Sequence, residues 1–320
     1  MQAVMYERFG DESVLSVREV PAPTPARDDV QVKVHVASLN PVDFKLRGGM
    51  LRMLGRPRRP AITGKDFAGE IASLGQGVQG YAVGQRVFGS VDPMGGNGSC
   101  AQFVSISTDL ITPTPDAVSD EVAACLPVAS GTALQVLTEF AHLQRGQTIL
   151  ITGASGSVGA SAVQLAHSIG ARITGVCSTA NVDYVRSLGA DRVIDYKIAD
   201  WQDIDARFDV IFDAAAATTF STAKPHLSTH GIYINTMPRA ALFLQAIMAR
   251  LSSRQRCVPY LLKTDTELLK RLGDLAADKV IVPLISEIVG LDQVALAQRR
   301  MQQGQVHGKI CVRVEAGSKI

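Results

Sequence analysis

The chain has 320 residues, a length that favours two domains over a single hydrophobic core. Hydrophobic residues make up 46% of it and charged residues 19%, which is typical of a globular protein and excludes a disordered chain. The formal net charge of +2 gives no reason to expect a nucleic acid as a partner. The five cysteines are widely spaced and form no Cys-x-x-Cys pair, so neither a disulfide framework nor a structural zinc site is indicated.

The chain shows no pattern of secretion or membrane insertion. Its beginning, MQAVMYERFG, carries Glu7 and Arg8 and lacks the apolar core of a secretory signal. The stretch 240–251 is apolar but too short to cross a bilayer. As a helix it would lack a polar face, so we expect it to be buried, to line a substrate cleft or to pack against a second subunit of a homodimer. We expect a cytoplasmic protein.

The first 120 residues have the pattern of short β-strands. Between Val30 and Val36 valines alternate with polar residues, a period of two that puts His35 on the solvent face of a half-buried strand. Glycine-rich turns in residues 75–89 separate further strands, which predicts a small barrel. The segment 46–60 is rich in arginine, and we interpret it as a solvated basic loop; attraction of an anionic substrate or of cofactor phosphates is the alternative. Its arginines are Arg47, Arg52, Arg56, Arg58 and Arg59.

Strands and helices alternate after residue 120, which predicts a doubly wound parallel sheet. The expected strands are 148–152, 172–178, 192–196 and 208–214, and the expected helices are 158–170 and 182–190. In the first helix one face is apolar and Gly170 is a natural stop. The last strand, in QVHGKICVRV (305–314), is expected to return to the barrel. We therefore predict a barrel domain over 1–120, a dinucleotide-binding domain over 121–275 and a C-terminal return over 276–320.

The segment LITGASGSVG (150–159) is a glycine-spaced turn between a strand and an amphipathic helix. In that context Gly153 lets the chain turn, Gly156 lets backbone N–H groups approach a pyrophosphate, and Gly159 lets helix and strand pack closely. A tight turn without a ligand is the alternative, but both flanks favour a dinucleotide. The predicted binding residues are Gly153, Ala154, Ser155, Gly156, Ser157, Val158 and Gly159.

The end of the second strand indicates which nicotinamide cofactor is used. An NAD site would place an acid there, whereas this chain has Cys177, Ser178 and Thr179. Small hydroxyl side chains leave room for a 2′-phosphate and can donate to it, although no arginine follows Cys177. Tyr196 and Lys197, after the next strand, could complete the pocket. We predict NADPH as the cofactor.

Several motifs occur in the order found in one enzyme family. They are ASLNPVDFKLRGG (37–49), GKDFAGEIASLGQGV (64–78), VGQRVFG (83–89), LPVASGTALQVL (126–137), RSLGADRVIDY (186–196) and GKICVRV (308–314). With the glycine turn they resemble the medium-chain dehydrogenase/reductase superfamily, specifically its zinc-free quinone and enone reductases, over nearly the whole chain. The resemblance implies an α/β fold with a GroES-like β-barrel catalytic domain, a Rossmann domain and a C-terminal return to the barrel.

The resemblance also bears on zinc. Zinc alcohol dehydrogenases of this superfamily hold catalytic zinc through a Cys and a His-Glu pair, and the matching positions here are Asn40 and Lys65–Asp66. Neither an amide nor an ammonium is a plausible zinc ligand. His226 and His230 stand four apart, but they are expected to flank a turn and no third ligand accompanies them. We expect a zinc-independent enzyme whose acceptor takes hydride readily, such as a quinone or an enone.

The resemblance places Asn40, Asp43, Lys45 and Thr132 around the nicotinamide, with Asn40 and Thr132 lining the ring and the cleft. Lys45 could donate a hydrogen bond to an enolate or be a solvated loop lysine. Asn40 could instead initiate a turn before Pro41, and Asp43 is expected to tie down the loop. We also assign Asn235 to the cofactor site. Two departures from the family pattern, ASGTA (129–133) and AAAA (214–217), change the expected cleft wall.

Two other functions remain open at this point. An enoyl-thioester reductase would need room and charge for a long carrier group, which the arginine-rich segment could supply. A non-catalytic NADPH-binding sensor or structural protein would keep the fold and the cofactor without turnover, because a fold does not determine a function.

Overall fold

The computed structural model describes residues 1–50, 60–92, 97–237 and 254–314. The chain forms two compact units, Met1–Val128 with Thr264–Ile320, and Ala129–Lys263. The sequence had placed these boundaries after residues 120 and 275. Helix α2 (Asp120–Cys125) packs on strands β3 (Asp29–Ser38) and β5 (Asp66–Leu74), and helix α8 (Thr266–Ala277) packs on strand β8 (Ile111–Pro113), so both belong to the first unit. The stretch 240–251 and four of the five arginines of the basic segment lie outside the described residues.

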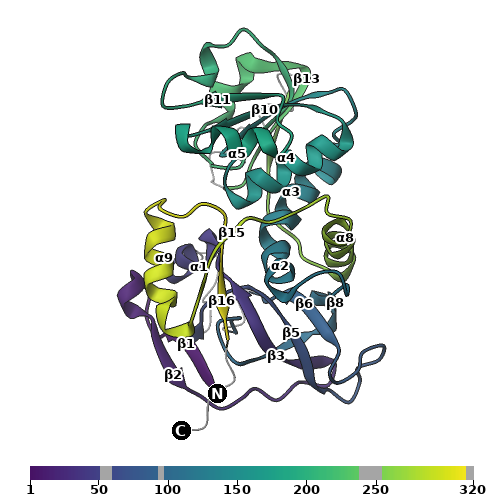
Figure 1. The fold of residues 1–320 in the computed structure, drawn as a ribbon, viewed down its shortest axis with the longest axis vertical. Coiled ribbons are helices and arrows are strands. Elements are labelled where there is room, and N and C mark those ends of the chain that lie inside the picture. Colours follow the sequence, from purple (N-terminus) through teal and green to yellow (C-terminus); the bar gives the residue numbers. More distant parts are fainter. Residues whose placement is uncertain (51–59, 93–96, 238–253, 315–320) are drawn as a thin grey trace. The chain divides into compact units, whose positions relative to one another are not determined.

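The first unit is built on two sheets (Figure 1). The smaller one has the strand order β2 (Ser16–Glu19), β1 (Gln2–Tyr6) and β4 (Ala61–Ile62). The larger one has the order β15 (Ile285–Val289), β16 (Lys309–Arg313), β3 (Asp29–Ser38), β5 (Asp66–Leu74), β6 (Arg86–Ser90) and β8 (Ile111–Pro113), with β7 (Phe103–Ser107) also paired to β3. The predicted GroES-like β-structure is confirmed.

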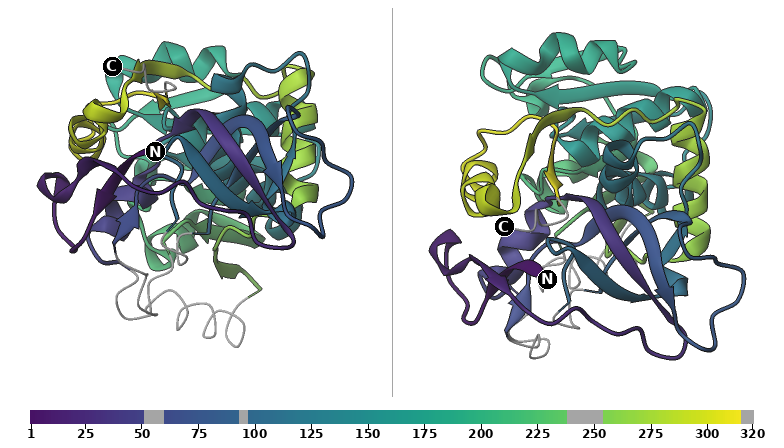
Figure 2. Two further views of the ribbon diagram at one scale, coloured as in Figure 1. Left: turned by 90° about the horizontal axis from the view of Figure 1, so that it is seen from below. Right: turned by 60° about the horizontal axis from the view of Figure 1, so that its bottom comes forward.

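The alternating valines of β3 form the centre of this unit. Val30, Val32, Val34 and Val36 are at most 3% exposed, as their period of two predicted. The C-terminal strand returns as predicted, because β16 runs antiparallel to β3 and pairs Val312 with Ala37. Figure 2 shows this strand and helix α9 (Val294–Gln302) beside the N-terminal strands of the same unit.

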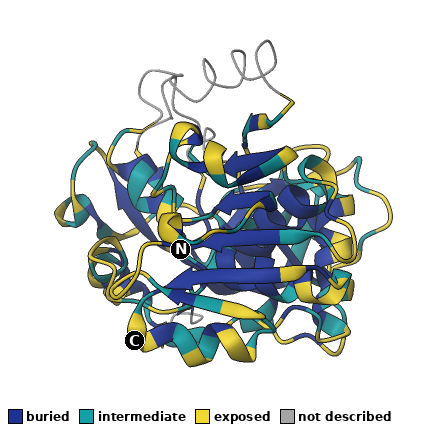
Figure 3. Cartoon of the chain, turned by 90° about the horizontal axis from the view of Figure 1, so that it is seen from above, coloured by how far each residue is buried: buried dark blue, intermediate teal, exposed yellow. Residues whose placement is uncertain are grey.

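The second unit contains a six-stranded parallel sheet. Its order is β11 (Arg192–Asp195), β10 (Arg172–Cys177), β9 (Thr148–Thr152), β12 (Phe208–Asp213), β13 (Leu227–Asn235) and β14 (Arg256–Pro259). All of its strand pairs are parallel, which confirms the doubly wound sheet. Buried residues are concentrated in the strands, whereas exposed ones lie on loops and outer helix faces (Figure 3).

The helices of the second unit follow the predicted pattern. Helix α4 (Ser157–Ile169) ends at Gly170, whose φ of 83° is the left-handed conformation that glycine adopts most easily. Ala162, Leu165 and Ala166 on its apolar face are buried. Helix α5 (Val182–Ser187) follows β10, and the unit also contains the short helices α3 (Gly131–Gln135) and α6 (Phe220–Ala223).

Two features differ from the sequence-based expectation. His230 lies inside β13 instead of beside a turn, and the ring of His226 packs edge-on against Trp201 at 5.2 Å, so the two histidines do not form a ligand pair. The other is a 21-residue helix over residues 120–140, which is apolar and long enough to cross a membrane. Of its most apolar stretch, 78% is buried inside the protein, which is typical of a core helix.

Candidate active site

The order of the parallel sheet reverses between β9 and β12 in the second unit. In sheets of this kind ligands bind at the carboxyl ends of the strands where the order reverses. The turn after β9 lies at this point. Gly153 has a φ of +63°, and a Cβ on it would come within 2.9 Å of the Cβ of Ala215 in the loop after β12. The two loops are therefore in contact across the reversal point.

The other two glycines of the turn differ in their surroundings. A Cβ on Gly159 would lie 2.1 Å from the carbonyl oxygen of Gly153, so only glycine permits this approach of helix and turn. A Cβ on Gly156 would meet one atom, at 3.4 Å, so the backbone is accessible there. Gly156 is the N-cap of α4, whose first N–H groups have no partner within the helix. This arrangement suits a phosphate group.

The side chains of the turn are not all directed outward. Ala154 is fully buried, and its N–H donates to the carbonyl oxygen of Val176, so it joins the turn to β10. Ser155, Ser157 and Val158 are half-buried. The seven residues predicted from the glycine pattern therefore form the turn and the start of α4, with Ala154 in a packing position.

The residues predicted to choose the nicotinamide cofactor lie together at the ends of β10 and β11. The N–H of Tyr196 donates to the carbonyl oxygen of Cys177 at 3.0 Å. Tyr196 is 54% exposed, and the Lys197 Nζ lies 5.3 Å from the centre of its ring. Thr179 is exposed, and Ser178 is half-buried and accepts from the Asn181 amide. No carboxylate follows β10 directly.

Cys177 itself faces inward. Its side chain is 1% exposed, and burial raises the pKa of its thiol to about 11. Asp195, at the end of β11, acts in the same direction on this pKa, and its carboxylate accepts from the N–H of Lys197. Cys177 therefore contributes its backbone to this edge of the sheet, and the hydroxyl and ammonium groups come from Ser178, Thr179, Tyr196 and Lys197.

A buried carboxylate organises the carboxyl ends of β9, β12 and β13. Asp213 is fully buried and accepts five hydrogen bonds, from Thr152, Tyr233, Asn235 and the N–H groups of Ala217 and Thr218. Asn235 also donates to the Tyr233 hydroxyl and accepts from the N–H of Met237. The Asn235 amide that we assigned to the cofactor is thus engaged within the protein.

The loop held by Asp213 has an unusual backbone. Ala216 has a φ of +52°, a left-handed conformation that disfavours residues with a Cβ. The amides on its C-terminal side both bond to the carboxylate of Asp213, which stabilises this conformation. The alanine run that departs from the family pattern is therefore a fixed loop at the point where the sheet order reverses.

Thr132 lies on α3 and is 6% exposed. Its hydroxyl forms a hydrogen bond with that of Tyr260. Burial raises the pKa of the Tyr260 hydroxyl, and the hydrogen bond with Thr132 opposes this shift. Tyr260 donates to Gln135, one turn further along α3. Ser130 belongs to the segment ASGTA (129–133), the other departure from the family pattern. Its hydroxyl forms a 3.0 Å hydrogen bond with that of Ser161 on α4, so it joins two helices.

In the first unit, Asn40 ends up in a buried polar cluster. It is the N-cap of α1 (Pro41–Arg47) and 2% exposed. Its Nδ2 donates to Asp66 at 2.9 Å and to the carbonyl oxygen of Ser38, and its Oδ1 accepts from the ammonium of Lys309 at 2.7 Å. Both ends of this amide are therefore bound within the protein. Asn40 precedes Pro41 as the N-cap of a helix, whereas the alternative that the sequence offered was a turn at this position.

Asp43 closes the same cluster. It is 3% exposed and accepts the N–H of Asn40 at 2.7 Å, which ties down the start of α1 as predicted. Burial raises the pKa of the Asp43 carboxyl to about 7, against the opposing effect of this hydrogen bond. The nearby Asp66 raises the pKa further, and Lys309 and Lys65 lower it. Asp43 is thus a carboxyl that titrates near neutrality inside the first unit.

The side chains that follow on α1 have different surroundings. Lys45 is half-buried. Arg47 is 1% exposed and donates to Gln298 and to the carbonyl oxygen of Gly10. The interpretation of the basic segment as a solvated loop is therefore wrong for Arg47, because its guanidinium is bonded inside the unit.

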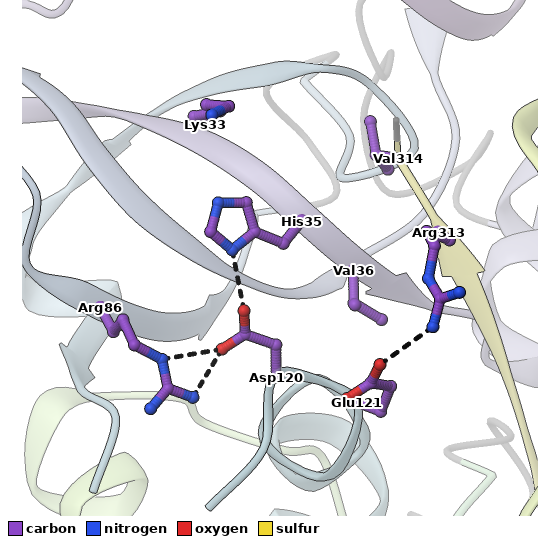
Figure 4. Close-up of a pocket in the computed structure, with 8 residues that line it drawn as sticks. All are labelled: Lys33, His35, Val36, Arg86, Asp120, Glu121, Arg313 and Val314. Carbon is purple, nitrogen blue, oxygen red and sulfur yellow. Dashed lines mark hydrogen bonds and ion pairs between the residues drawn. The ribbon is translucent and has the colours of Figure 1, made fainter. Parts of the chain in front are cut away.

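A separate hollow of about 430 Å³ lies on the first unit (Figure 4). His35 lies on the face of β3 opposite the buried valines, and its Nδ1 is 2.8 Å from Asp120. The cations in the hollow are paired: Arg86 with Asp120, Arg313 with Glu121 and Lys33 with Glu70. Because the acids neutralise the bases, this hollow offers no uncompensated charge, and we do not place the active site in it.

Comparisons with known proteins agree with this geometry. Residues 26–116 match the alcohol dehydrogenase GroES-like domain, and residues 188–312 match the zinc-binding dehydrogenase family. The chain is 34% identical over 323 residues to the chloroplast envelope quinone oxidoreductase homolog of Arabidopsis thaliana, with 98% of both chains covered. It is also similar to the quinone oxidoreductase of Coxiella burnetii, with a TM-score of 0.90, 29% identity and coverage of 98% and 99%.

Part of the chain resembles a further reductase. Over 224 residues it is 34% identical to the NADPH-dependent alkenal/one oxidoreductase of Arabidopsis thaliana, which covers 67% of this chain and 57% of the relative. Fold, site and relatives together define a two-domain oxidoreductase of the alcohol dehydrogenase type. The chain belongs to the medium-chain dehydrogenase/reductase superfamily, among its quinone oxidoreductases.

The name of one matching family implies zinc, and the residues at the relevant positions do not suit that metal. Asn40 and Asp66 both face the ammonium of Lys309, whose Nζ lies 2.7 Å from Asn40 Oδ1 and 3.8 Å from an Asp66 oxygen. A fixed positive charge at this distance repels a cation, and an amide is not a zinc ligand. Among the described residues no three His, Cys, Asp or Glu side chains are grouped to hold a metal.

The sequence analysis did not identify three side chains of the polar clusters around Asp213 and Asn40. Asp213 ends the strand FDVIFDA, and an acid at the end of a buried strand was the available signal. Lys309 begins the strand KICVR at a buried position, next to apolar residues. Tyr233, also in a buried strand, carried a hydroxyl that needed a partner. Each was visible as a polar residue in an apolar run.

The raised pKa of Asp43 makes stability depend on pH. The folded protein keeps this proton up to about pH 7, whereas the unfolded chain releases it near the usual pKa of 3.8. The free energy of unfolding therefore falls as the pH rises from about 4 to about 7. Asp43→Asn cannot ionise, so it should gain stability relative to the wild type over this range, by a few kcal/mol at most.

Urea denaturation of both proteins at several pH values measures this difference. A free-energy difference that stays constant between pH 4.5 and 7.5 would show that Asp43 does not titrate in this range.

Proposed function

We propose that this protein is a zinc-independent, NADPH-dependent reductase of quinones or α,β-unsaturated carbonyl compounds. Two features together carry the proposal. The second unit has a turn suited to a phosphate where the order of the parallel sheet reverses, and the first unit has the Lys309 ammonium where zinc-dependent relatives have a metal site. Relatives named quinone oxidoreductase and NADPH-dependent alkenal/one oxidoreductase support the substrate class.

The residues of the second unit suit a dinucleotide phosphate. The accessible backbone at Gly156 and the start of α4 would hold the pyrophosphate. Ser178, Thr179, Tyr196 and Lys197 would accept the 2′-phosphate, since they offer hydroxyl donors and one ammonium at a strand end with no carboxylate directly after β10. When bound, the cofactor would supply the hydride that the acceptor takes up.

The protein's part in the reaction is positioning and stabilisation of charge. Addition of hydride to a quinone or an enone leaves negative charge on the carbonyl oxygen of the substrate, and a hydrogen-bond donor lowers the energy of that state. In the first unit we assign this role to Lys45, which lies on α1, the helix that Asn40 caps. The donor stabilises the oxyanion, and the remaining proton comes from water or a nearby side chain.

The test of the function is oxidation of NADPH by the purified protein with a panel of quinones, enones and enoyl thioesters, with and without a chelator. We expect turnover of quinones or enones that the chelator does not change. Turnover that stops when bound zinc is removed would contradict the zinc-free reaction. NADPH binding with no turnover of any acceptor would favour a cofactor sensor, and preference for thioesters would favour an enoyl reductase.

Cofactor choice can be tested at the strand end. Ser178→Asp places a carboxylate where a 2′-phosphate is expected, so NADPH should bind at least about tenfold more weakly. NADH should be affected much less, because it has no phosphate there. Fluorescence titration of both cofactors measures the two dissociation constants.

Ser187→Asp provides the matched control for this variant. The same charge is then added on the exposed end of α5, and affinity for both cofactors should stay as in the wild type. Equal weakening of NADPH and NADH by Ser178→Asp would refute the assignment of the phosphate pocket.

The role of Lys45 is tested by Lys45→Met. Loss of the donor should lower kcat for enones by about tenfold to a hundredfold, with the NADPH dissociation constant unchanged. Lys45→Arg keeps a cationic donor and should retain most of the activity. If Lys45→Met reduces enones at the wild-type rate, Lys45 is not the donor, and the hydride-transfer function is unaffected.

A further inference from the structure

Lys309 is a lysine with a buried charge. It lies at the start of β16, is 2% exposed, and its Nζ donates to Asn40 Oδ1 at 2.7 Å and to the carbonyl oxygen of Leu39 at 3.2 Å. An ammonium is rarely buried unless it is paired and hydrogen-bonded. The partners of Lys309 are therefore the reason that it can occupy this position.

The counter-charge is Asp66, which is fully buried. One of its oxygens lies 3.8 Å from the Lys309 Nζ and accepts from Asn40 at 2.9 Å and from the N–H of Val128 at 3.1 Å. Burial raises the pKa of this carboxyl, and Lys309 is the strongest opposing influence. The cluster thus joins β16, β5 and the start of α1 with Val128.

The two charges also fix the orientation of the Asn40 amide. Its oxygen faces the ammonium and its NH₂ group faces the carboxylate. A rotation of the amide by half a turn would place NH₂ against the ammonium and oxygen against the carboxylate, so only one orientation is stable. Together with the bond from Lys309 to Leu39 and the cap from Asp43, this fixes the residue at which α1 begins.

We propose that Lys309 is a positioning residue of the reductase: an internal cation that replaces a metal at the Asn40 and Asp66 positions and holds the start of α1, and with it Lys45, in place. Asn40 and Asp66 match zinc-ligand positions of the zinc-dependent relatives, and in this chain both bind the ammonium. The catalytic part of this proposal rests on the proposed function.

The test compares Lys309→Met with the double variant Lys309→Met/Asp66→Asn. The single variant leaves a buried carboxylate without its nearest counter-charge and could fail to fold, whereas the double variant removes both charges. In whichever variant folds, we expect kcat for quinones or enones to fall at least about tenfold, because small displacements of a catalytic group have large effects. The NADPH dissociation constant should stay within about twofold, because the phosphate-accepting turn belongs to the second unit.

Amide hydrogen exchange gives a readout that does not depend on activity. Exchange over residues 39–47 should become at least about tenfold faster in the variants, since the start of α1 loses its anchor. The matched control is Arg313→Met, at the other end of the same strand, which removes only an exposed ion pair with Glu121. We expect wild-type kcat and exchange in this control.

Three results would overturn the proposal: an unchanged kcat in a folded Lys309 variant, unchanged exchange over 39–47, or an equal loss in Arg313→Met. Failure of the proposed function is distinguishable from these results. If the wild-type protein reduces no acceptor, the function fails, and hydrogen exchange alone then decides whether Lys309 positions α1.

Discussion

The pairing of the last described strand with β3 is the interaction on which the first unit depends. It inserts Ile310 and Val312 into the barrel core and places Cys311 against Cys125 of α2, and all three residues of the strand are fully buried. The same pairing carries Lys309 inside, because the residue lies at the start of a strand whose neighbours are apolar. A buried ammonium needs a carboxylate, and Asp66 at the start of β5 supplies it. Hydrophobic pairing and charge compensation therefore stabilise the same arrangement.

The second unit contains a buried carboxylate in a different setting. Asp213 has no lysine among its hydrogen-bond partners and is stabilised by neutral donors from strands and from the loop that follows it. Several donors can stabilise a buried carboxylate as an ion pair does. Asp66 joins elements of the barrel through charge, whereas Asp213 shapes a loop where a ligand is expected. Both carboxylates hold backbone in fixed positions next to residues assigned to function.

The relation to zinc-dependent members of the superfamily follows from this chemistry. A metal site needs ligands that give up their protons and remain available, whereas the Asn40 amide is neutral and bound at both ends. The cation at these positions is covalently part of the chain. Such a cation cannot polarise a substrate as a metal can, but it does not have to be acquired, and it keeps the surrounding backbone in one conformation.

Local patterns determined much of the architecture. The alternation in β3, the apolar face of α4 and the stop at Gly170 are properties of a few neighbouring residues, so the sequence predicted them correctly. The glycine turn was recognisable for the same reason: Gly153 has a positive φ, and Gly159 approaches the carbonyl oxygen of Gly153 within a single strand–turn–helix unit. The domain boundaries were harder to predict from the sequence, because α2 and α8 join the first unit through contacts with strands that are distant in the chain.

The roles of individual polar side chains depended on the tertiary structure. Asn40 and Lys309 are 269 residues apart, and no local pattern indicates that they meet. The same holds for Arg47, which the sequence placed in a solvated loop and the fold buries against Gln298. The sequence by itself determined the class of fold, the family and the kind of cofactor turn, since these depend on periodicity and on short motifs. Only the tertiary structure decided which charges are buried and paired, because that depends on which distant strands pack together.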